Sequence, residues 1–214
     1  MRKDSRLILA LDETREDRAI AVAEEVSDLV DAVKINWPLI LATSPAIIST
    51  LSTMSDVICD FKVADIPNTS RLIVEQAVAR GASGVVVHGF AGNDSLRTAI
   101  EASGKADVFV VVEMSHPGGR EFIQAAAERI ARMAVECGAA GVIAPATRPD
   151  RIREIRKMVG DLLVLAPGVG AQGGNASDPI SMGADYVIVG RAIYRADSPR
   201  RAAETLVEEI RGNL

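Results

Sequence analysis

The stretch that decides the fold is residues 57–88, VICDFKVADIPNTSRLIVEQAVARGASGVVVH. It begins with an apolar run, Val57–Phe61, continues through an amphipathic stretch, Thr69–Ala79, and returns to a second apolar run, Gly84–Val87. Gly81 separates the helical pattern from the second run, as a helix C-terminal cap does. The order strand, helix, strand predicts a βαβ unit with parallel strands.

The same alternation extends over the rest of the chain. Helical patterns recur at Glu16–Val26 and Glu121–Cys137, and Gly138 and Gly183 stand where further helix caps are expected. Most apolar runs are nearly continuous, which is typical of strands covered by helices on both faces. The predicted strands are Arg6–Leu11, Ala32–Ile35, Val57–Phe61, Gly84–Val87, Val108–Glu113, Gly141–Ala144, Leu162–Ala166 and Tyr186–Val189.

Eight strands, each followed by a helical segment, predict an α/β protein with a (β/α)8 TIM barrel. A doubly wound open sheet is the alternative, but it needs fewer strands and usually has a glycine-rich loop after the first one. Here the first strand ends in Leu11-Asp12-Glu13-Thr14, without glycine. No linker or low-complexity tract interrupts the pattern, so we expect residues 1–214 to form a single catalytic domain.

The composition narrows the class of protein. The chain has 214 residues, of which 48% are hydrophobic and 25% charged, as in ordinary soluble globular proteins. Its net charge of −5 argues against a broad nucleic-acid-binding face. Cys59 and Cys137 lack CxxC spacing, so we expect both to be reduced core residues. No apolar run is long enough for a signal-peptide core or a membrane span, so we expect a cytoplasmic protein without a membrane partner.

Charged residues stand at the ends of several predicted strands, where the active site of a TIM barrel forms. Asp60 and Lys62 are two residues apart on the third strand, so both should point to the same face. Opposite charges inside a barrel are costly unless they are paired or functional. A structural salt bridge is one explanation. Asp12 and Lys34 at neighbouring strand ends favour a functional array instead.

Two glycine-containing loops suggest a phosphate site. Gly168 and Gly170 follow the seventh strand, and Gly190 with Arg191 follows the eighth. These loops commonly bind phosphate in this fold, and an arginine adds a charge-assisted contact. Either loop alone would be explained by a tight turn, whereas both loops together with an arginine favour a phosphate site. The sequence Gln-Gly-Gly-Asn at residues 172–175 predicts either a lid over the ligand or an ordinary surface loop.

The two histidines do not predict a metal site. His88 ends the fourth strand and His116 precedes Pro117-Gly118, and neither has a carboxylate at metal-ligand spacing. We expect His88 to be a hydrogen-bonded barrel residue and His116 to shape its loop. The sequence also lacks HExxH, P-loop and GxGxxG motifs.

Residues 60–67, DFKVADIP, resemble the DxKxxD signature of the orotidine 5′-monophosphate decarboxylase family. The order and spacing of the motifs fit that family over nearly the whole chain, and the short loops resemble its archaeal members. The other matching segments are Leu11-Asp12, Val33-Lys34-Ile35, Val87-His88-Gly89, Glu113-Met114-Ser115-His116-Pro117-Gly118, Pro167-Gly168-Val169-Gly170-Ala171-Gln172-Gly173-Gly174 and Val189-Gly190-Arg191.

The resemblance implies conversion of orotidine 5′-monophosphate to UMP and CO2 in pyrimidine biosynthesis, without a metal or cofactor. It implies a catalytic tetrad of Lys34, Asp60, Lys62 and Asp65, in which Lys62 protonates C6 of the pyrimidine. It also implies a homodimer in which Asp65 and Thr69 enter the partner's active site.

The resemblance further implies how the substrate is bound. Asp12 and Lys34 would contact the ribose, Ser115 the pyrimidine edge, and Arg191 the phosphate, with Gln172 bridging base and phosphate from the lid. Trp37 stands where a bulky aromatic is expected and has no implied catalytic role. The implied substrate-binding set is Asp12, Lys34, Ile66, Thr69, Ser115, Pro167, Gly168, Gly170, Gln172, Gly190 and Arg191.

Fixed charges suit such a reaction because decarboxylation leaves electrons on an sp2 carbon without an electron sink, and preorganised electrostatics can stabilise that charge. Two rival functions remain. Mg²⁺-dependent sugar-phosphate enzymes of the same suprafamily place a carboxylate ligand on strand two, whereas this chain has Lys34 there. A non-catalytic nucleotide-phosphate binder would not need Asp60 and Asp65 near an anion.

Overall fold

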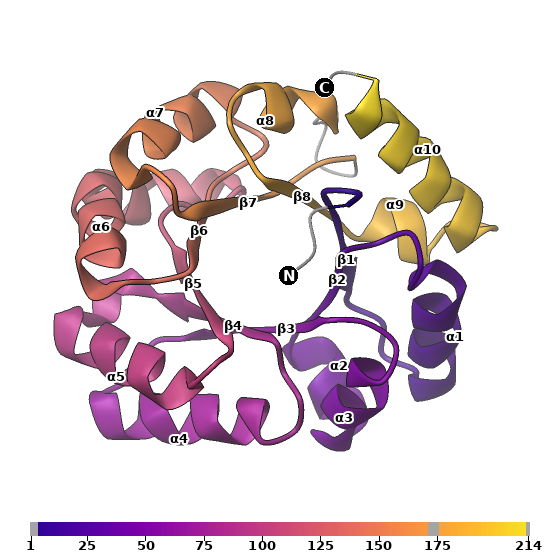
Figure 1. The fold of residues 1–214 in the computed structure, drawn as a ribbon, viewed down its shortest axis with the longest axis horizontal. Helices are drawn as coiled ribbons and strands as arrows, with labels where there is room; N and C mark the ends of the chain where they lie inside the picture. Colours follow the sequence, from indigo (N-terminus) through magenta and orange to yellow (C-terminus); the bar gives the residue numbers. More distant parts are fainter. Residues whose placement is uncertain (1–3, 171–175, 213–214) are drawn as a thin grey trace.

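The computed structural model describes residues 4–170 and 176–212 and shows a closed barrel of eight parallel strands in chain order. Helices surround the barrel (Figure 1). The last strand pairs with the first, with Leu7 opposite Val187 and Leu9 opposite Val189. The predicted TIM barrel is therefore confirmed, and the open-sheet alternative is wrong because the sheet has no free edge.

The elements alternate as the sequence predicts. The strands are β1 Leu7–Leu11, β2 Ala32–Ile35, β3 Val57–Val63, β4 Gly84–His88, β5 Asp107–Val111, β6 Gly141–Ile143, β7 Leu163–Pro167 and β8 Tyr186–Val189. The α-helices are α1 Glu16–Val26, α2 Trp37–Ala42, α3 Ala46–Ser52, α4 Pro67–Val78, α5 Asn93–Ser103, α6 Ile123–Cys137, α7 Pro149–Val159, α8 Ser177–Ser181, α9 Arg191–Tyr194 and α10 Pro199–Arg211. Two short 3-10 helices are η1 Gly89–Ala91 and η2 Pro117–Arg120.

The largest boundary differences lie at the site end of the barrel. Strand β3 continues two residues past the predicted Phe61, and β5 ends at Val111, two residues before the predicted Glu113. Helix α4 begins at Pro67, before the predicted Thr69, because proline at the first helical turn needs no backbone N–H partner. Of the predicted caps, Gly138 directly follows α6 in the left-handed conformation with φ of 77°. Helices α4 and α8 end at the cap residues Ala79 and Met182, and Gly81 and Gly183 follow these with positive φ.

The apolar core has two layers, one inside the barrel and one between the barrel and the helices. The interior is filled by residues of alternate strand positions, including Ile8, Phe109 and Tyr186. A larger cluster packs the outer strand faces against the surrounding helices. Because both faces are covered, strands such as β1 are buried along their whole length, as the continuous apolar runs predict.

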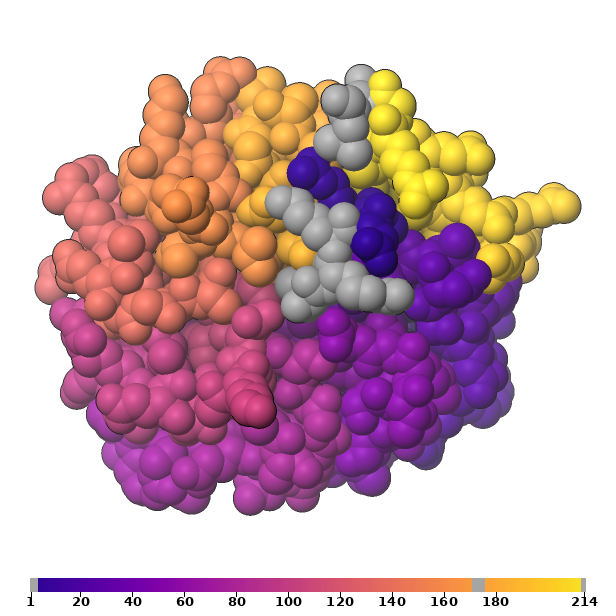
Figure 2. Space-filling view, viewed as in Figure 1, coloured from indigo at the N-terminus to yellow at the C-terminus, as the bar shows by residue number. Residues whose placement is uncertain are grey.

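Helices α1 and α10 meet where the ring of helices closes, and Figure 2 shows the indigo-to-purple and yellow segments in contact there. Arg200 of α10 forms an ion pair with Asp28 at 2.8 Å and donates to the carbonyl of Glu25 at 3.1 Å. Within the described residues, no helix combines the length and apolar character that a membrane crossing requires.

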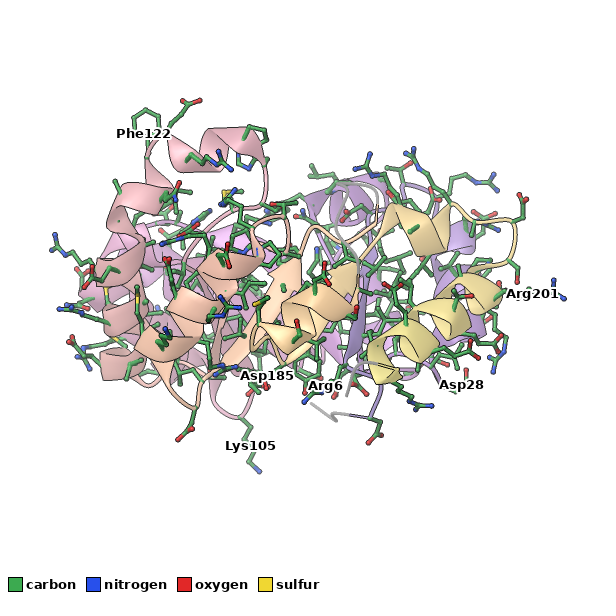
Figure 3. All side chains as sticks on the ribbon, turned by 90° about the horizontal axis from the view of Figure 1, so that it is seen from above. Arg6, Asp28, Lys105, Phe122, Asp185 and Arg201 are labelled. Atoms are coloured by element: carbon green, nitrogen blue, oxygen red, sulfur yellow. The ribbon has the colours of Figure 1, made fainter. Side chains whose placement is uncertain are left out.

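The two ends of the barrel differ in what they carry. Figure 3 places Arg6 and Asp185, which directly precede β1 and β8, at one face, and Phe122 at the other. Phe122 belongs to the connection that leaves the C-terminal end of β5.

Of the cysteines, Cys59 is a buried core residue as expected, whereas Cys137 is only half-buried, and neither forms a disulfide.

Candidate active site

A pocket of about 250 Å³ opens where the C-terminal ends of the strands converge. Its floor is the topmost apolar layer of the barrel interior, and its walls carry the charged and glycine residues that follow the strands. The lining residues are Ala10, Asp12, Lys34, Asp60, Lys62, Val86, Val111, Glu113, Met114, Ser115, Ile143, Pro167, Gly168, Val169, Ile188, Gly190 and Arg191.

A row of alternating charges crosses one wall of this pocket. The Asp60 carboxylate accepts a hydrogen bond from Lys34 Nζ at 2.8 Å and another from Lys62 Nζ at 2.8 Å. Lys34 and Asp60 are buried, whereas the Lys62 side chain is 31% exposed. The sequence predicts that charged residues converge here, and these three do. Lys62, at one end of the row, has the more exposed ammonium group.

The two cations decide the charge of Asp60. Burial by itself raises the pKa of this carboxyl, but the charges of Lys34 and Lys62 and their hydrogen bonds outweigh burial, so the pKa lies below its ordinary value. The carboxylate therefore stays ionised at neutral pH. The row carries one negative charge between two positive ones before any ligand is present.

The backbone at Lys62 departs from regular strand geometry. Its φ is 47°, a value that non-glycine residues rarely adopt, and the pairing of β3 with β4 shifts register between Cys59 and Val63. Simple alternation along a strand is therefore not the full reason that Asp60 and Lys62 share a face. Behind them, Phe61 points outward and stacks on Trp37 with ring centroids 4.5 Å apart.

Asp12 reaches the same pocket from the end of β1. Its Oδ1 atom is buried and has no hydrogen-bond partner among residues 4–170 and 176–212. A buried acceptor without a partner is costly, so this oxygen is suited to a ligand that brings a hydroxyl group. Asp12 is thus placed next to the charge row with unused hydrogen-bonding capacity.

The two glycine loops lie side by side at the opposite wall. Gly168 and Gly170 have φ of 115° and 74°, which explains glycine at both positions. A Cβ atom on Gly170 would stand 3.2 Å from Ala192, and one on Gly190 would stand 3.1 Å from the carbonyl of Ala10. The loops therefore form one surface, and the exposed side chain of Arg191 belongs to it.

Three other predicted site residues lie outside this pocket. Asp65 and Ile66 are exposed, and the Asp65 carboxylate accepts from the backbone N–H of Ile66 at 2.7 Å. Thr69 lines a separate apolar groove of about 340 Å³ together with Trp37 and Leu72. Gln172, predicted in the lid, lies outside the described residues.

Neither histidine enters the pocket lining. His88 Nδ1 is buried without a hydrogen-bond partner in the described part of the chain, so the expected hydrogen-bonded role is not met at this atom. Burial, reinforced by the charge of Lys62, lowers the pKa of His88 to about 4. His116 is exposed, and its carbonyl accepts from Gly119 at 3.1 Å, in keeping with a loop role.

The described residues include no cluster of three or more His, Cys, Asp or Glu side chains suited to a metal ion.

Sequence reasoning noted Glu113 at a strand end but gave it no role, and it missed Arg148 and Arg151. Glu113 is fully buried and paired with both arginines. The sequence did carry a signal for this pairing. A buried acid needs cations, and two arginines three residues apart stand at the start of α7, the second α-helix after Glu113.

Comparisons with known proteins agree with this geometry. Residues 5–206 match the model of the Orotidine 5′-phosphate decarboxylase / HUMPS family. A Methanosarcina mazei protein named orotidine 5′-phosphate decarboxylase is 58% identical over 217 residues, covering 100% of this chain and 99% of that protein. A Thermococcus kodakarensis protein of the same name is 49% identical, covering 97% of this chain and 98% of its own length.

The same family is found among solved structures. The crystal structure of orotidine 5′-monophosphate decarboxylase from Methanocaldococcus jannaschii, complexed with the inhibitor BMP, matches with a TM-score of 0.91. The two chains are 41% identical, and the match covers 95% of this chain and 97% of that one. On fold, site and sequence, the chain belongs to the Orotidine 5′-phosphate decarboxylase / HUMPS family.

Proposed function

We propose that this protein decarboxylates orotidine 5′-monophosphate to UMP and CO2. The observation that carries the proposal is the charge row, in which Asp60 is held between Lys34 and Lys62 at 2.8 Å on each side. The names of relatives that are 58% and 54% identical to this chain support the same activity. It would place the protein in pyrimidine biosynthesis, in the cytoplasm.

The pocket offers a site for each part of such a nucleotide. The phosphate fits the joined surface of Gly168, Gly190 and Arg191, where backbone groups and a guanidinium can bind an anion. Asp12, with its unpartnered Oδ1, and Lys34 lie where ribose hydroxyls would be bound. The base would then extend towards Lys62, with Ser115 at its edge and Pro167 lining the pocket.

In this arrangement Lys62 acts on the reacting carbon. As CO2 leaves, the electron pair of the broken bond remains on C6, and a nearby ammonium stabilises the negative charge. Lys62 then donates its proton to C6, which yields UMP and a neutral amine that regains a proton from solvent. Asp60 keeps the ammonium oriented through its 2.8 Å hydrogen bond. The charges are fixed in advance, so little reorganisation is needed during the reaction.

We further propose a homodimer in which each subunit completes the other's site. Asp65 and Thr69 lie outside their own subunit's pocket, as residues that serve a partner would. Near them, Ile66, Leu72 and Trp37 expose 66%, 46% and 41% of their surface, and Leu72 and Trp37 line a mainly apolar groove. Burial of such a surface by a second copy is energetically favourable.

A Mg²⁺-dependent sugar-phosphate reaction is the alternative within the family. Two ammonium groups beside Asp60 oppose the binding of a divalent cation at this carboxylate, which disfavours that reaction. Treatment with EDTA separates the two functions. Full activity on orotidine 5′-monophosphate after EDTA treatment supports the metal-free reaction, and loss of activity that Mg²⁺ restores supports the alternative.

The decisive experiment measures the loss of ultraviolet absorbance that accompanies conversion of orotidine 5′-monophosphate to UMP. The wild-type protein should turn over this substrate, whereas Lys62→Ala should abolish turnover and still bind UMP. No turnover by a folded wild-type protein refutes the proposed activity. Near-normal turnover by Lys62→Ala refutes the role of this lysine as proton donor.

A further inference from the structure

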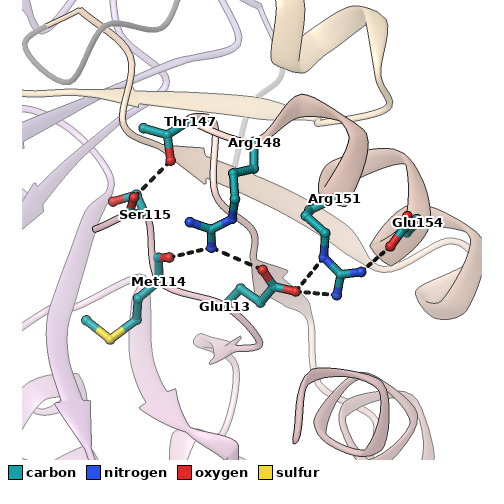
Figure 4. A network of polar contacts seen from close by, with 7 residues as sticks. All are labelled: Glu113, Met114, Ser115, Thr147, Arg148, Arg151 and Glu154. Carbon is teal, nitrogen blue, oxygen red and sulfur yellow. Dashed lines mark hydrogen bonds and ion pairs between the residues drawn. The ribbon is translucent and has the colours of Figure 1, made fainter. Parts of the chain in front are cut away.

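The backbone carbonyls of Met114 and Ser115 lie beyond the end of a strand and accept hydrogen bonds from side chains. Strand β5 ends at Val111, and the N–H groups of the next two residues both point to the carbonyl of Ile143, at 3.2 and 3.3 Å. Beyond them, the carbonyl of Met114 accepts from Arg148 Nη2 at 2.8 Å. The carbonyl of Ser115 accepts from Thr147 Oγ1 at 2.9 Å (Figure 4).

The same arginine is anchored to a buried acid. Glu113 is fully buried, and its Oε2 accepts from Arg148 Nη2 at 3.1 Å. Its Oε1 accepts from Arg151 Nε at 2.8 Å, and Arg151 Nη2 donates to the same oxygen. Arg148 and Arg151 stand one turn apart at the start of α7, and each guanidinium group reaches a different oxygen of the carboxylate (Figure 4). We call Glu113, Arg148 and Arg151, together with Thr147, the Glu113 network.

The network connects a rigid anchor to a wall of the pocket. The Arg148 side chain is only 11% exposed, and its Nη2 atom joins the Glu113 carboxylate to the Met114 carbonyl. Met114 and Ser115 line the pocket, whereas Arg148 lines a neighbouring cavity that also contacts Ser115 and Arg191. Because hydrogen bonds weaken outside a narrow range of length and angle, a small displacement of this segment would spoil a contact made by Ser115.

We propose that the Glu113 network is a positioning device that sets the affinity of the site for the base of its nucleotide ligand, by fixing the backbone of Met114 and Ser115. The inference rests on the proposed function, in which Ser115 contacts the pyrimidine edge. The arginines act through the segment and do not touch the ligand. The network therefore governs recognition of the base, whereas Asp12, Lys34 and Arg191 contact the ribose and the phosphate through their own side chains.

The chain offers a matched control on the same helix. Arg156 of α7 forms an ion pair with Asp185 and donates to the carbonyls of Gly183 and Leu162. It thus links α7 to the barrel as Arg148 does, but at the end away from the pocket, where Asp185 lies in Figure 3. A substitution there removes a comparable set of contacts without changing the pocket wall.

The test compares two ligands that differ by the base. Binding of UMP and of ribose 5-phosphate is measured by calorimetry for wild type, Arg148→Met and Arg156→Met. Arg148→Met should weaken UMP binding roughly 5- to 10-fold, the value of one well-formed hydrogen bond, and change ribose 5-phosphate binding less than about twofold. Arg156→Met should lower the melting temperature and leave both affinities within about twofold. Arg148→Lys should recover part of the UMP affinity.

Several results would overturn the inference. These are an equal loss of affinity for both ligands in Arg148→Met, unchanged UMP binding in that variant, or the same selective loss in Arg156→Met. Wild-type protein that binds ribose 5-phosphate as tightly as UMP would also overturn it, because no base contact would then exist. Absence of decarboxylation refutes the proposed activity alone, since the binding comparison does not depend on turnover.

A second variant covers the case in which Arg148→Met does not fold. Thr147→Val removes the hydroxyl that contacts the Ser115 carbonyl and leaves the buried ion pairs intact. It should weaken UMP binding roughly 2- to 5-fold with little effect on ribose 5-phosphate. Unchanged binding of both ligands would show that the segment does not depend on these side chains.

Discussion

Replacement of Asp60 by Asn tests the charge row most directly. The substitution keeps the size of the side chain and one acceptor oxygen, but it removes the negative charge between Lys34 and Lys62. Lys34 is 6% exposed, so its ammonium would remain buried without an anion. The variant therefore isolates the electrostatic role of Asp60 from its packing.

The size of the effect follows from burial. Removing one partner of a buried ion pair costs about 3–5 kcal/mol, because the remaining charge is left unpaired in a medium of low polarity. The pair with Lys62 adds less than about 1 kcal/mol, since that side chain is 31% exposed and solvent screens it. We expect Asp60→Asn to lower the free energy of unfolding by about 3–5 kcal/mol at pH 7, or roughly 10 °C in melting temperature for a chain of this size.

Urea denaturation at pH 7 measures this difference, and Lys34→Met/Asp60→Asn is the control. The double variant removes the unpaired ammonium and should regain about 2 kcal/mol relative to Asp60→Asn. Since the folded-state pKa of Asp60 is lowered, its contribution is present above the unfolded value near 4 and is lost as the pH falls through the folded value. The difference between wild type and Asp60→Asn should therefore shrink below about pH 4. An unfolding free energy within 1 kcal/mol of wild type at pH 7 would refute the reasoning.

Three further outcomes are expected. Arg191→Ala should lower kcat/KM for orotidine 5′-monophosphate at least about 100-fold, because a remote phosphate contact also organises the site; an unchanged kcat/KM contradicts this. As the pH falls from 6.5 to about 4, unfolded His88 binds a proton that the folded ring excludes, so wild-type stability should fall and His88→Gln should flatten that slope in urea titrations. Leu72→Asp should yield monomers with reduced activity in sedimentation and rate assays, whereas Val135→Asp, at similar exposure, should not.

The fold and the polar residues of the pocket were largely predictable from the sequence. Continuous apolar runs separated by amphipathic stretches predict a barrel, and the barrel places strand ends together, so Asp12, Lys34, Asp60 and Lys62 converge in the pocket. This works because strand and helix periods are local properties of the chain, and the fold class then fixes which ends of the strands meet.

The features that escaped prediction depend on tertiary contacts. The left-handed backbone of Lys62 arises at a shift of register, which the residue letters do not reveal. Arg148 and Arg151 are separated from Glu113 by more than thirty residues, and their pairing is created only when the start of α7 folds against the segment that follows β5. Asp65 and Thr69 lie outside the pocket of their own subunit, a position that the family resemblance implies but that strand and helix patterns alone do not predict.

The pairing of β1 with β8 has a consequence for biogenesis. Leu7 meets Val187, so β1 cannot pair with β8 until the polypeptide has been synthesised past residue 189. Until then β1 and β7 present unpaired N–H and C=O groups along strongly apolar segments, which are prone to aggregation. A chain truncated before Tyr186 would keep both edges open, and we expect it to accumulate in inclusion bodies rather than as a smaller barrel.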